Sequence, residues 1–236
     1  MIEAVLILFA AGLIYYVATR VAPHGLMFKI KKEEAAIRDK EQSKKQPIEL
    51  EEDKEENVLI KEGQELLNRD LLEGAEKKFL SAIKIDPISA KAYHFLGMIY
   101  LRQKIYKGAI ATLEKAVKLD PLNDIAFNNL GSAYLGIENY EKAAESFEKS
   151  VSLNDKIAHR YLNLSIAHNH LKNYEKAAIA LENAAKIYPT GENLSLLAKC
   201  YLAMDDKKLA KRTIERLLDV DPKNPWAKRQ LASFED

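Results

Sequence analysis

The sequence predicts an all-α protein in which helical hairpins repeat along the chain and stack into an α-solenoid. Three observations lead to this fold class. The chain repeats itself with a period of 34 residues, the apolar residues of each repeat have helical spacing, and prolines recur where the repeats end. An uncharged stretch near the N-terminus adds a single predicted transmembrane helix before the solenoid.

The internal repeat is clearest when residues 90–123 are compared with residues 124–157. Self-similarity at a fixed period between about 20 and 50 residues is typical of solenoid architectures. The main correspondences are Tyr93 with Phe127, Leu96 with Leu130, Gly97 with Gly131, Tyr100 with Tyr134, Ala109 with Ala143, and Leu113 with Phe147.

Each repeat is predicted to form two helices that pack against each other. In residues 90–123 the first helix carries on one face Tyr93, Leu96, Gly97 and Tyr100, and the second carries Ala109, Leu113 and Ala116. These spacings place each set on one side of a helix. The small residues let the two backbones approach closely, and the large ones fill the space between them. Pro121 then ends the second helix, because proline lacks the N–H that would continue it.

Extending this frame along the chain gives five repeats and a final helix. The predicted repeats are residues 56–89, 90–123, 124–157, 158–190 and 191–224. Their register is supported by Pro87, Pro121, Pro189 and Pro222, with Asp155 in place of a proline in the third repeat. Residues 225–236 are predicted to form a capping helix, because a repeat array needs a last element with one apolar and one polar side.

The pattern Leu-Gly-x-x-Tyr, then Ala-x-x-x-Leu or Phe, then Pro resembles the tetratricopeptide repeat (TPR) family. In the second repeat it is carried by Leu96-Gly97, Tyr100, Ala109, Leu113 and Pro121. The resemblance implies a right-handed α-solenoid. Solenoids use their extended concave surface for binding, so the expected partner is a protein or an extended peptide.

Composition and motifs argue against catalysis and against nucleic acid as a partner. The formal net charge is only +1, so no strong basic field is expected. The sequence has no glycine-rich phosphate loop, no Gly-x-Ser-x-Gly and no His-Glu-x-x-His. The single cysteine, Cys200, is expected to be a small buried apolar residue. His168 stands where other repeats carry tyrosine and is expected in the core, pointing away from His170, so neither a metal nor a cofactor is expected.

The N-terminal segment is predicted to be an uncleaved membrane anchor. Residues 4–18 carry no charge, and residues 2–22 are long enough to cross most of a bilayer core if Arg20 reaches the head groups. Glu3 precedes the apolar run and the basic residues follow it, which is the reverse of a signal peptide and places the repeats in the cytoplasm, as at a bacterial inner membrane or its equivalent. A cleaved or oppositely oriented segment is the alternative. The predicted anchor with its interfacial stretch spans residues 1–28, and residues 29–55 form a charged linker.

The first helices of the repeats are predicted to line a concave groove that binds peptide. The predicted groove residues are His94, Met98, Arg102, Asn128, Asn129, Ser132, His159, Asn163, Ile166 and Asn169. Asn129 and Asn163 lie one period apart and are predicted to stack on adjacent helices, where their amides could pair with a peptide backbone. This resembles the asparagine ladder of O-GlcNAc transferases and kinesin light chains, although only two rungs are present. The alternative is that both are ordinary solvent-facing residues.

A second binding mode of the family, the carboxylate clamp of co-chaperones, is not expected, because among its positions only Asn129 matches. The sequence therefore predicts a membrane-anchored TPR scaffold or adaptor that binds a protein or peptide partner and recruits or assembles a complex at the membrane. The alternative is a permanent structural subunit of a membrane protein complex.

Overall fold

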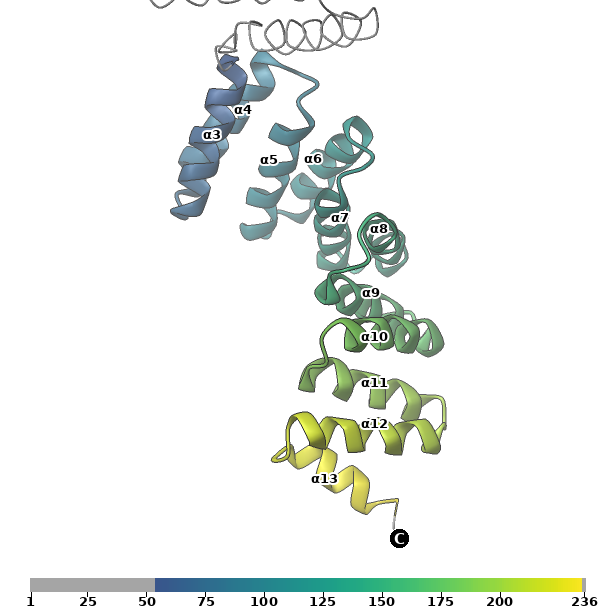
Figure 1. Ribbon diagram of the computed structural model, residues 1–236. Coiled ribbons are helices and arrows are strands. Elements are labelled where there is room, and N and C mark those ends of the chain that lie inside the picture. Colours follow the sequence, from purple (N-terminus) through teal and green to yellow (C-terminus); the bar gives the residue numbers. More distant parts are fainter. Residues whose placement is uncertain (1–53, 235–236) are drawn as a thin grey trace, which may run out of the picture. The chain divides into compact units, whose positions relative to one another are not determined.

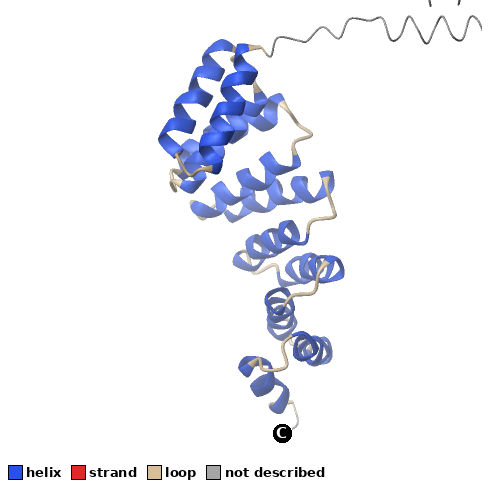
Figure 2. Ribbon diagram, turned by 60° about the vertical axis from the view of Figure 1, so that its left-hand side comes forward, coloured by secondary structure: helices blue, strands red, loops and turns tan. Residues whose placement is uncertain are grey.

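The computed structural model describes residues 54–234, and this part of the chain is helical throughout (Figures 1 and 2). Within it there are eleven α-helices and no strand. The helices are α3 (Glu55–Asn68), α4 (Leu72–Ile85), α5 (Ala90–Arg102), α6 (Tyr106–Leu119), α7 (Asp124–Gly136), α8 (Tyr140–Leu153), α9 (Ala158–His170), α10 (Tyr174–Ile187), α11 (Gly191–Ala203), α12 (Lys207–Val220) and α13 (Pro225–Ala232). The prediction of an all-helical array of hairpins is confirmed.

The predicted membrane anchor of residues 2–22, the interfacial stretch and nearly all of the charged linker lie outside the described residues. In the part of the chain that the structure covers, no helix combines the length and the apolar character needed to cross a bilayer. The anchor therefore stays a prediction from the sequence.

In the first three hairpins, close packing of the two helices is made possible by a glycine on the first helix. A Cβ atom added to Gly97 would lie 2.5 Å from Cγ of Leu113, and one added to Gly131 would lie 2.6 Å from Cε1 of Phe147. Both distances are shorter than real Cβ contacts, so the large side chain of the second helix fills the space that the glycine leaves. The same relation holds between Gly63 and Phe79 in the first hairpin.

The two helices of every hairpin are joined by the same turn. In each, one residue adopts the left-handed conformation, with φ between 57° and 61°, and none of the five is glycine; they are Asp70, Lys104, Glu138, Lys172 and Asp205. The N–H of the next residue donates a hydrogen bond to a backbone carbonyl of the first helix, as Ile105 does to Tyr100 at 2.8 Å. This is the Schellman arrangement, in which the left-handed residue usually is glycine.

The hairpins stack in chain order from α3 to α12 (Figure 1). The first helices also contact one another, α3 with α5, α5 with α7 and α7 with α9, whereas within residues 54–234 the second helices have no comparable contacts with each other. The first helices therefore lie on the inner side of the stack. At the end of the stack, α13 packs on α12, and Ala227 is buried. Trp226, Leu231 and Phe234 pack against an apolar cluster that includes Leu194, Ile214 and Leu217.

A tyrosine hydroxyl joins most hairpins to the one before. Tyr100 donates to Glu76 at 3.1 Å and Tyr201 donates to Glu182 at 2.5 Å, in each case from a first helix to the preceding second helix. In the fourth hairpin His168 takes the tyrosine's place, with Nε2 3.4 Å from Glu148. His168 is buried, as expected for a core position.

Candidate peptide-binding surface

The structure places the ten predicted groove residues on the first helices α5, α7 and α9, with different exposures. One is buried (His94), six are half-buried (Met98, Asn128, Asn129, Ser132, Asn163 and Ile166) and three are exposed (Arg102, His159 and Asn169). The surface is therefore mixed, with polar amides on α7 and α9 and apolar side chains such as Met98 on α5 and Ile166 on α9.

Two of the asparagines bind side chains of the preceding first helix. Nδ2 of Asn129 lies 3.1 Å from Nε2 of His94, and Nδ2 of Asn163 donates to Oδ1 of Asn128 at 3.1 Å. Burial lowers the pKa of His94, in spite of the charge of Asp120, so the imidazole is neutral at pH 7 and its Nε2 can accept from Asn129.

These bonds do not join Asn129 to Asn163, and the predicted pairing of the two amides with a peptide backbone stays a prediction. Asn163 is hydrogen-bonded to Asn128 rather than to its periodic counterpart Asn129, because side chains on adjacent first helices meet at a separation of 35 residues and not 34. Nor are these amides simply solvent-facing. Each links two hairpins through one hydrogen bond, and Asn163 uses only one of its two N–H groups in that bond.

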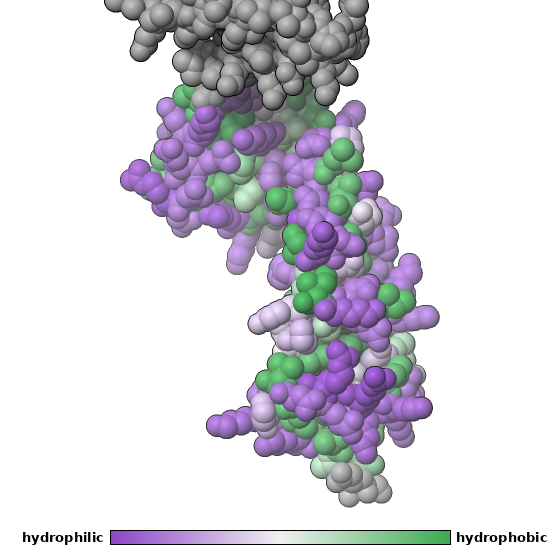
Figure 3. Space-filling view, viewed as in Figure 1, coloured by the Kyte–Doolittle hydropathy of each residue, from purple (hydrophilic) through white to green (hydrophobic). Residues whose placement is uncertain are grey.

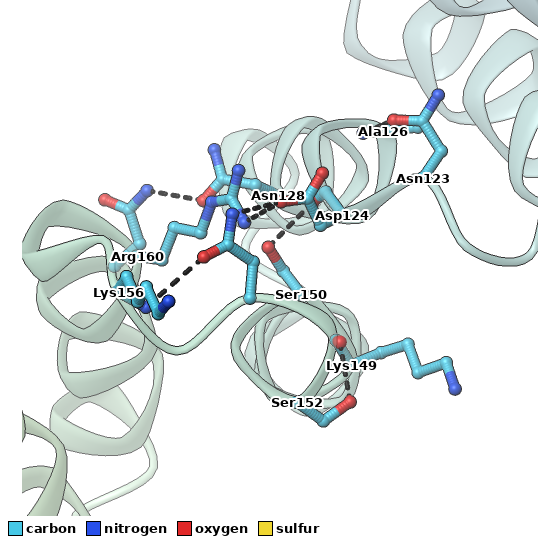
Figure 4. A network of polar contacts seen from close by, with 11 residues as sticks. Asn123, Asp124, Ala126, Asn128, Lys149, Ser150, Ser152, Lys156 and Arg160 are labelled. Atoms are coloured by element: carbon cyan, nitrogen blue, oxygen red, sulfur yellow. Dashed lines mark hydrogen bonds and ion pairs between the residues drawn. The ribbon is translucent and has the colours of Figure 1, made fainter.

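Beside this amide pair lies a polar network that the repeat pattern does not predict (Figure 4). Nη1 of Arg160 on α9 contacts Oδ2 of Asp124, the first residue of α7, at 2.5 Å. Asn154 donates to the same oxygen at 2.8 Å, and Ser150 donates to the backbone carbonyl of Asp124 at 2.7 Å. The network joins the third hairpin to the fourth along the edge of the inner surface.

Arg160 is only 5% exposed, so its charge depends on Asp124 for compensation. Burial by itself would raise the pKa of Asp124, but the hydrogen bonds from Arg160 and Asn154 outweigh it and hold the pKa below its usual value. The signal in the sequence is that Arg160 occupies the position of Ala92 and Ala126 in the preceding repeats, both fully buried. An arginine that stands where other repeats have a small buried residue needs a carboxylate nearby, because a buried charge must be compensated.

Arg102 is held at the end of α5 and does not extend freely over the surface. Its Nη1 donates to the backbone carbonyl of Leu67 at 3.3 Å and lies 3.4 Å from Oδ1 of Asp70. The guanidinium thus covers the carbonyl end of α3, where helix carbonyls lack partners within the helix. Arg102 therefore links the first two hairpins, and its contact with a ligand stays a prediction.

Between α9, α10 and α11 the inner surface is hollowed into a pocket of about 250 Å³. Two predicted groove residues, Ile166 and Asn169, line it, and the others are Ser165, Leu181, Leu196, Lys199 and Cys200. The 34-residue repeat pattern predicts that Ile166 and Asn169 lie on this surface. It does not predict that α11 forms a pocket with them.

Within residues 54–234, the neighbouring His168 and His170 have different surroundings, and Cys200 is buried. His170 points away from His168 and stacks on the Tyr140 ring at a centroid distance of 4.3 Å. Burial raises the pKa of Cys200 to about 11, which keeps the thiol protonated at neutral pH. Across residues 54–234 there is no group of three or more histidine, cysteine, aspartate or glutamate side chains with metal-binding geometry.

A stack of helical hairpins with an accessible inner surface defines a helical-repeat protein. Models described as TPR repeat or tetratricopeptide repeat match residues 99–138, 128–192 and 168–232, which together make up more than half of the chain. The chain belongs to the tetratricopeptide repeat family.

Solved structures of other proteins have the same fold. MamA is 23% identical with a TM-score of 0.64 over 68% of this chain and 95% of its own, and MamA from Desulfovibrio magneticus RS-1 is 20% identical with a TM-score of 0.65 over 73% and 98%. YrrB, described as a TPR protein with an unusual peptide-binding site, is 20% identical with a TM-score of 0.66 over 72% and 89%. At these identities the likeness concerns the fold. No curated protein sequence matches the chain significantly.

Proposed function

We propose that this protein is a membrane-anchored scaffold that binds an extended segment of a protein partner on the inner surface of its first helices. The observation that carries the proposal is the continuous row of α5, α7 and α9, whose side chains form one mixed polar and apolar surface. The similarity of fold to YrrB, a protein with a peptide-binding site, supports the same use of the surface. Binding in this way recruits a partner without requiring catalytic residues.

The polar groups of this surface suit an extended peptide. The side chains of Asn128, Asn129 and Asn163 are half-buried and already oriented by contacts between hairpins. Because a side-chain amide has two donors and an acceptor, an oriented Asn163 can pair with a peptide backbone while keeping its bond to Asn128. Groups held in position before binding lose less entropy when the partner arrives.

An arginine in the middle of the surface should block binding. Ser132 on α7 occupies the repeat position of Met98 and Ile166, and its hydroxyl donates only to the carbonyl of Asn128 in its own helix. Ser132→Arg should therefore leave the fold intact and weaken partner capture by at least about tenfold, corresponding to about 1.4 kcal/mol. The measurement is crosslinking followed by affinity capture of the full chain from its native membrane.

The matched control is Ser152→Arg, because Ser152 is exposed on the second helix α8 and its hydroxyl also bonds only to its own helix. It should capture the partner as well as the native protein does. If Ser132→Arg captures the partner at the native level, the inner surface is not the binding site.

The membrane anchor is part of the proposal and rests on the uncharged run in residues 4–18 and the basic residues that follow it. Alkaline carbonate should leave the intact chain in the membrane pellet, because an inserted helix resists extraction that removes surface-bound proteins. Protease added from the non-cytoplasmic side should spare the repeats. A mature chain that begins after Pro23, or repeats digested from outside, would show that the anchor or its orientation is wrong.

The alternative, a permanent structural subunit, is favoured by apolar side chains exposed where one hairpin leads into the next. Ile88, Leu122 and Tyr188 are 70%, 77% and 67% exposed, and Figure 3 shows apolar patches among the hydrophilic residues of the face in view. A stoichiometric complex that survives Ser132→Arg but is lost on Leu122→Asp would support this alternative.

A further inference from the structure

The pocket between α9, α10 and α11 combines an apolar interior with a charged rim. Leu181 and Cys200 are 1% and 3% exposed and form its base. Ile166 and Leu196, both half-buried, supply apolar walls, and exposed Lys199 also lines it. Only the exposed Asn169 and buried Ser165 add neutral polar groups.

The size of the pocket decides what class of ligand it can take. Sites for small molecules usually have volumes of about 300–1,000 Å³, so 250 Å³ is small for a cofactor. A dry apolar cavity of about 150 Å³ is known to hold benzene. The pocket is therefore suited to one large apolar side chain, such as leucine, methionine or phenylalanine.

Lys199 gives the rim a positive charge that the earlier hairpins lack. The equivalent positions on α5, α7 and α9 carry Met98, Ser132 and Ile166. The ammonium of Lys199 lies 5.4 Å from the centre of the Trp226 ring, a cation–π contact with α13. Among residues 54–234 no carboxylate forms an ion pair with Lys199, so an acidic group of a ligand can take that place.

We propose that this pocket sets the specificity of the peptide-binding surface, by taking one large apolar side chain of the bound segment while Lys199 pairs with a carboxylate beside it. The inference rests on the proposed function and adds the chemistry of the partner. The occupant is an acidic, extended peptide segment. Its carboxylate comes either from an aspartate or glutamate side chain or from the end of a chain.

The test is an array of short randomised peptides probed with the full chain in mild detergent. Native protein should select peptides in which a large apolar residue lies next to an acidic one. Two changes to the selected peptides distinguish the sources of the carboxylate. Replacing the acidic residue by asparagine or glutamine removes a side-chain carboxylate, and amidating the C-terminus removes the carboxylate at the end of the chain. Lys199→Glu should lower the affinity for the selected peptides by about fivefold or more and shift the preference to peptides with a basic residue beside the apolar one. Lys208→Glu, at an exposed position of α12, should leave the selection unchanged.

The apolar part of the pocket has its own readout, because half-buried Leu196 forms one of its walls. Leu196→Ala should weaken the preference for a large apolar residue and keep the preference for its acidic neighbour. If the selected peptides lack the apolar–acidic pattern, or if native protein and Lys199→Glu select the same pattern, the proposed role of the pocket is wrong but the proposed function still stands. Selection of no peptide would overturn the proposed function with it.

Discussion

Replacing Asp124 by alanine should lower the free energy of unfolding by about 3 kcal/mol. The change leaves the guanidinium of Arg160, with 7% of its side chain exposed, without its carboxylate. Removing one partner of a buried ion pair typically costs about 3–5 kcal/mol, and the lower end applies because 23% of the Asp124 side chain is accessible to water. Alanine itself suits the position, since Ala90 and Ala158 stand there in the neighbouring repeats. Urea unfolding followed by circular dichroism measures the loss.

A double variant separates the lost ion pair from other effects. Asp124→Ala with Arg160→Ala removes both charges and restores the residue that Ala92 and Ala126 provide in the preceding repeats. It should be more stable than Asp124→Ala alone, because no buried charge is left unpaired. Equal losses in the single and the double variant would mean that Arg160 does not depend on Asp124.

The Asp124 contribution should also depend on pH in one direction. Its pKa is lowered in the folded state, so its stabilising effect is complete above the ordinary value of about 3.9 and is lost as the pH falls through the folded value. The difference in stability between native protein and Asp124→Ala should therefore be constant near neutral pH and shrink in acid.

Gly131→Leu should destabilise the third hairpin by about 3 kcal/mol, the upper part of the usual range for overpacking. A Cβ atom at Gly131 would already lie 2.6 Å from Cε1 and 2.7 Å from Cδ1 of Phe147, and leucine adds three more carbon atoms in the same space. Hydrogen exchange should show the greatest loss of protection in helices α5 to α10, because each hairpin of a solenoid is stabilised mainly by its neighbours.

Two alanine variants provide the comparison for Gly131→Leu. Gly131→Ala should have an intermediate effect, since its Cβ alone meets the Phe147 ring, whereas Gly191→Ala should have little, since its nearest contact would be 3.7 Å away. A loss of protection spread evenly from α3 to α13 would be inconsistent with a stack stabilised by nearest neighbours.

The sequence by itself determined the hairpins and their order. The 34-residue period, the helical spacing of apolar residues, the small residue at Gly97 and Gly131 and the proline stops all act within one hairpin or between identical neighbours. Such signals are local and repeated, so they can be read from the chain without coordinates. They also placed His168 in the core and the predicted groove residues on the first helices.

Only the tertiary structure decided which side chains meet between hairpins. Asn129 pairs with His94 and Asn163 with Asn128, at a separation of 35 residues that the period of 34 does not predict. The ion pair of Arg160 with Asp124 and the pocket beside Lys199 likewise depend on how adjacent first helices are offset and rotated. A difference of one position along a helix is enough to change the partner of a polar group, and the repeat pattern alone does not determine it.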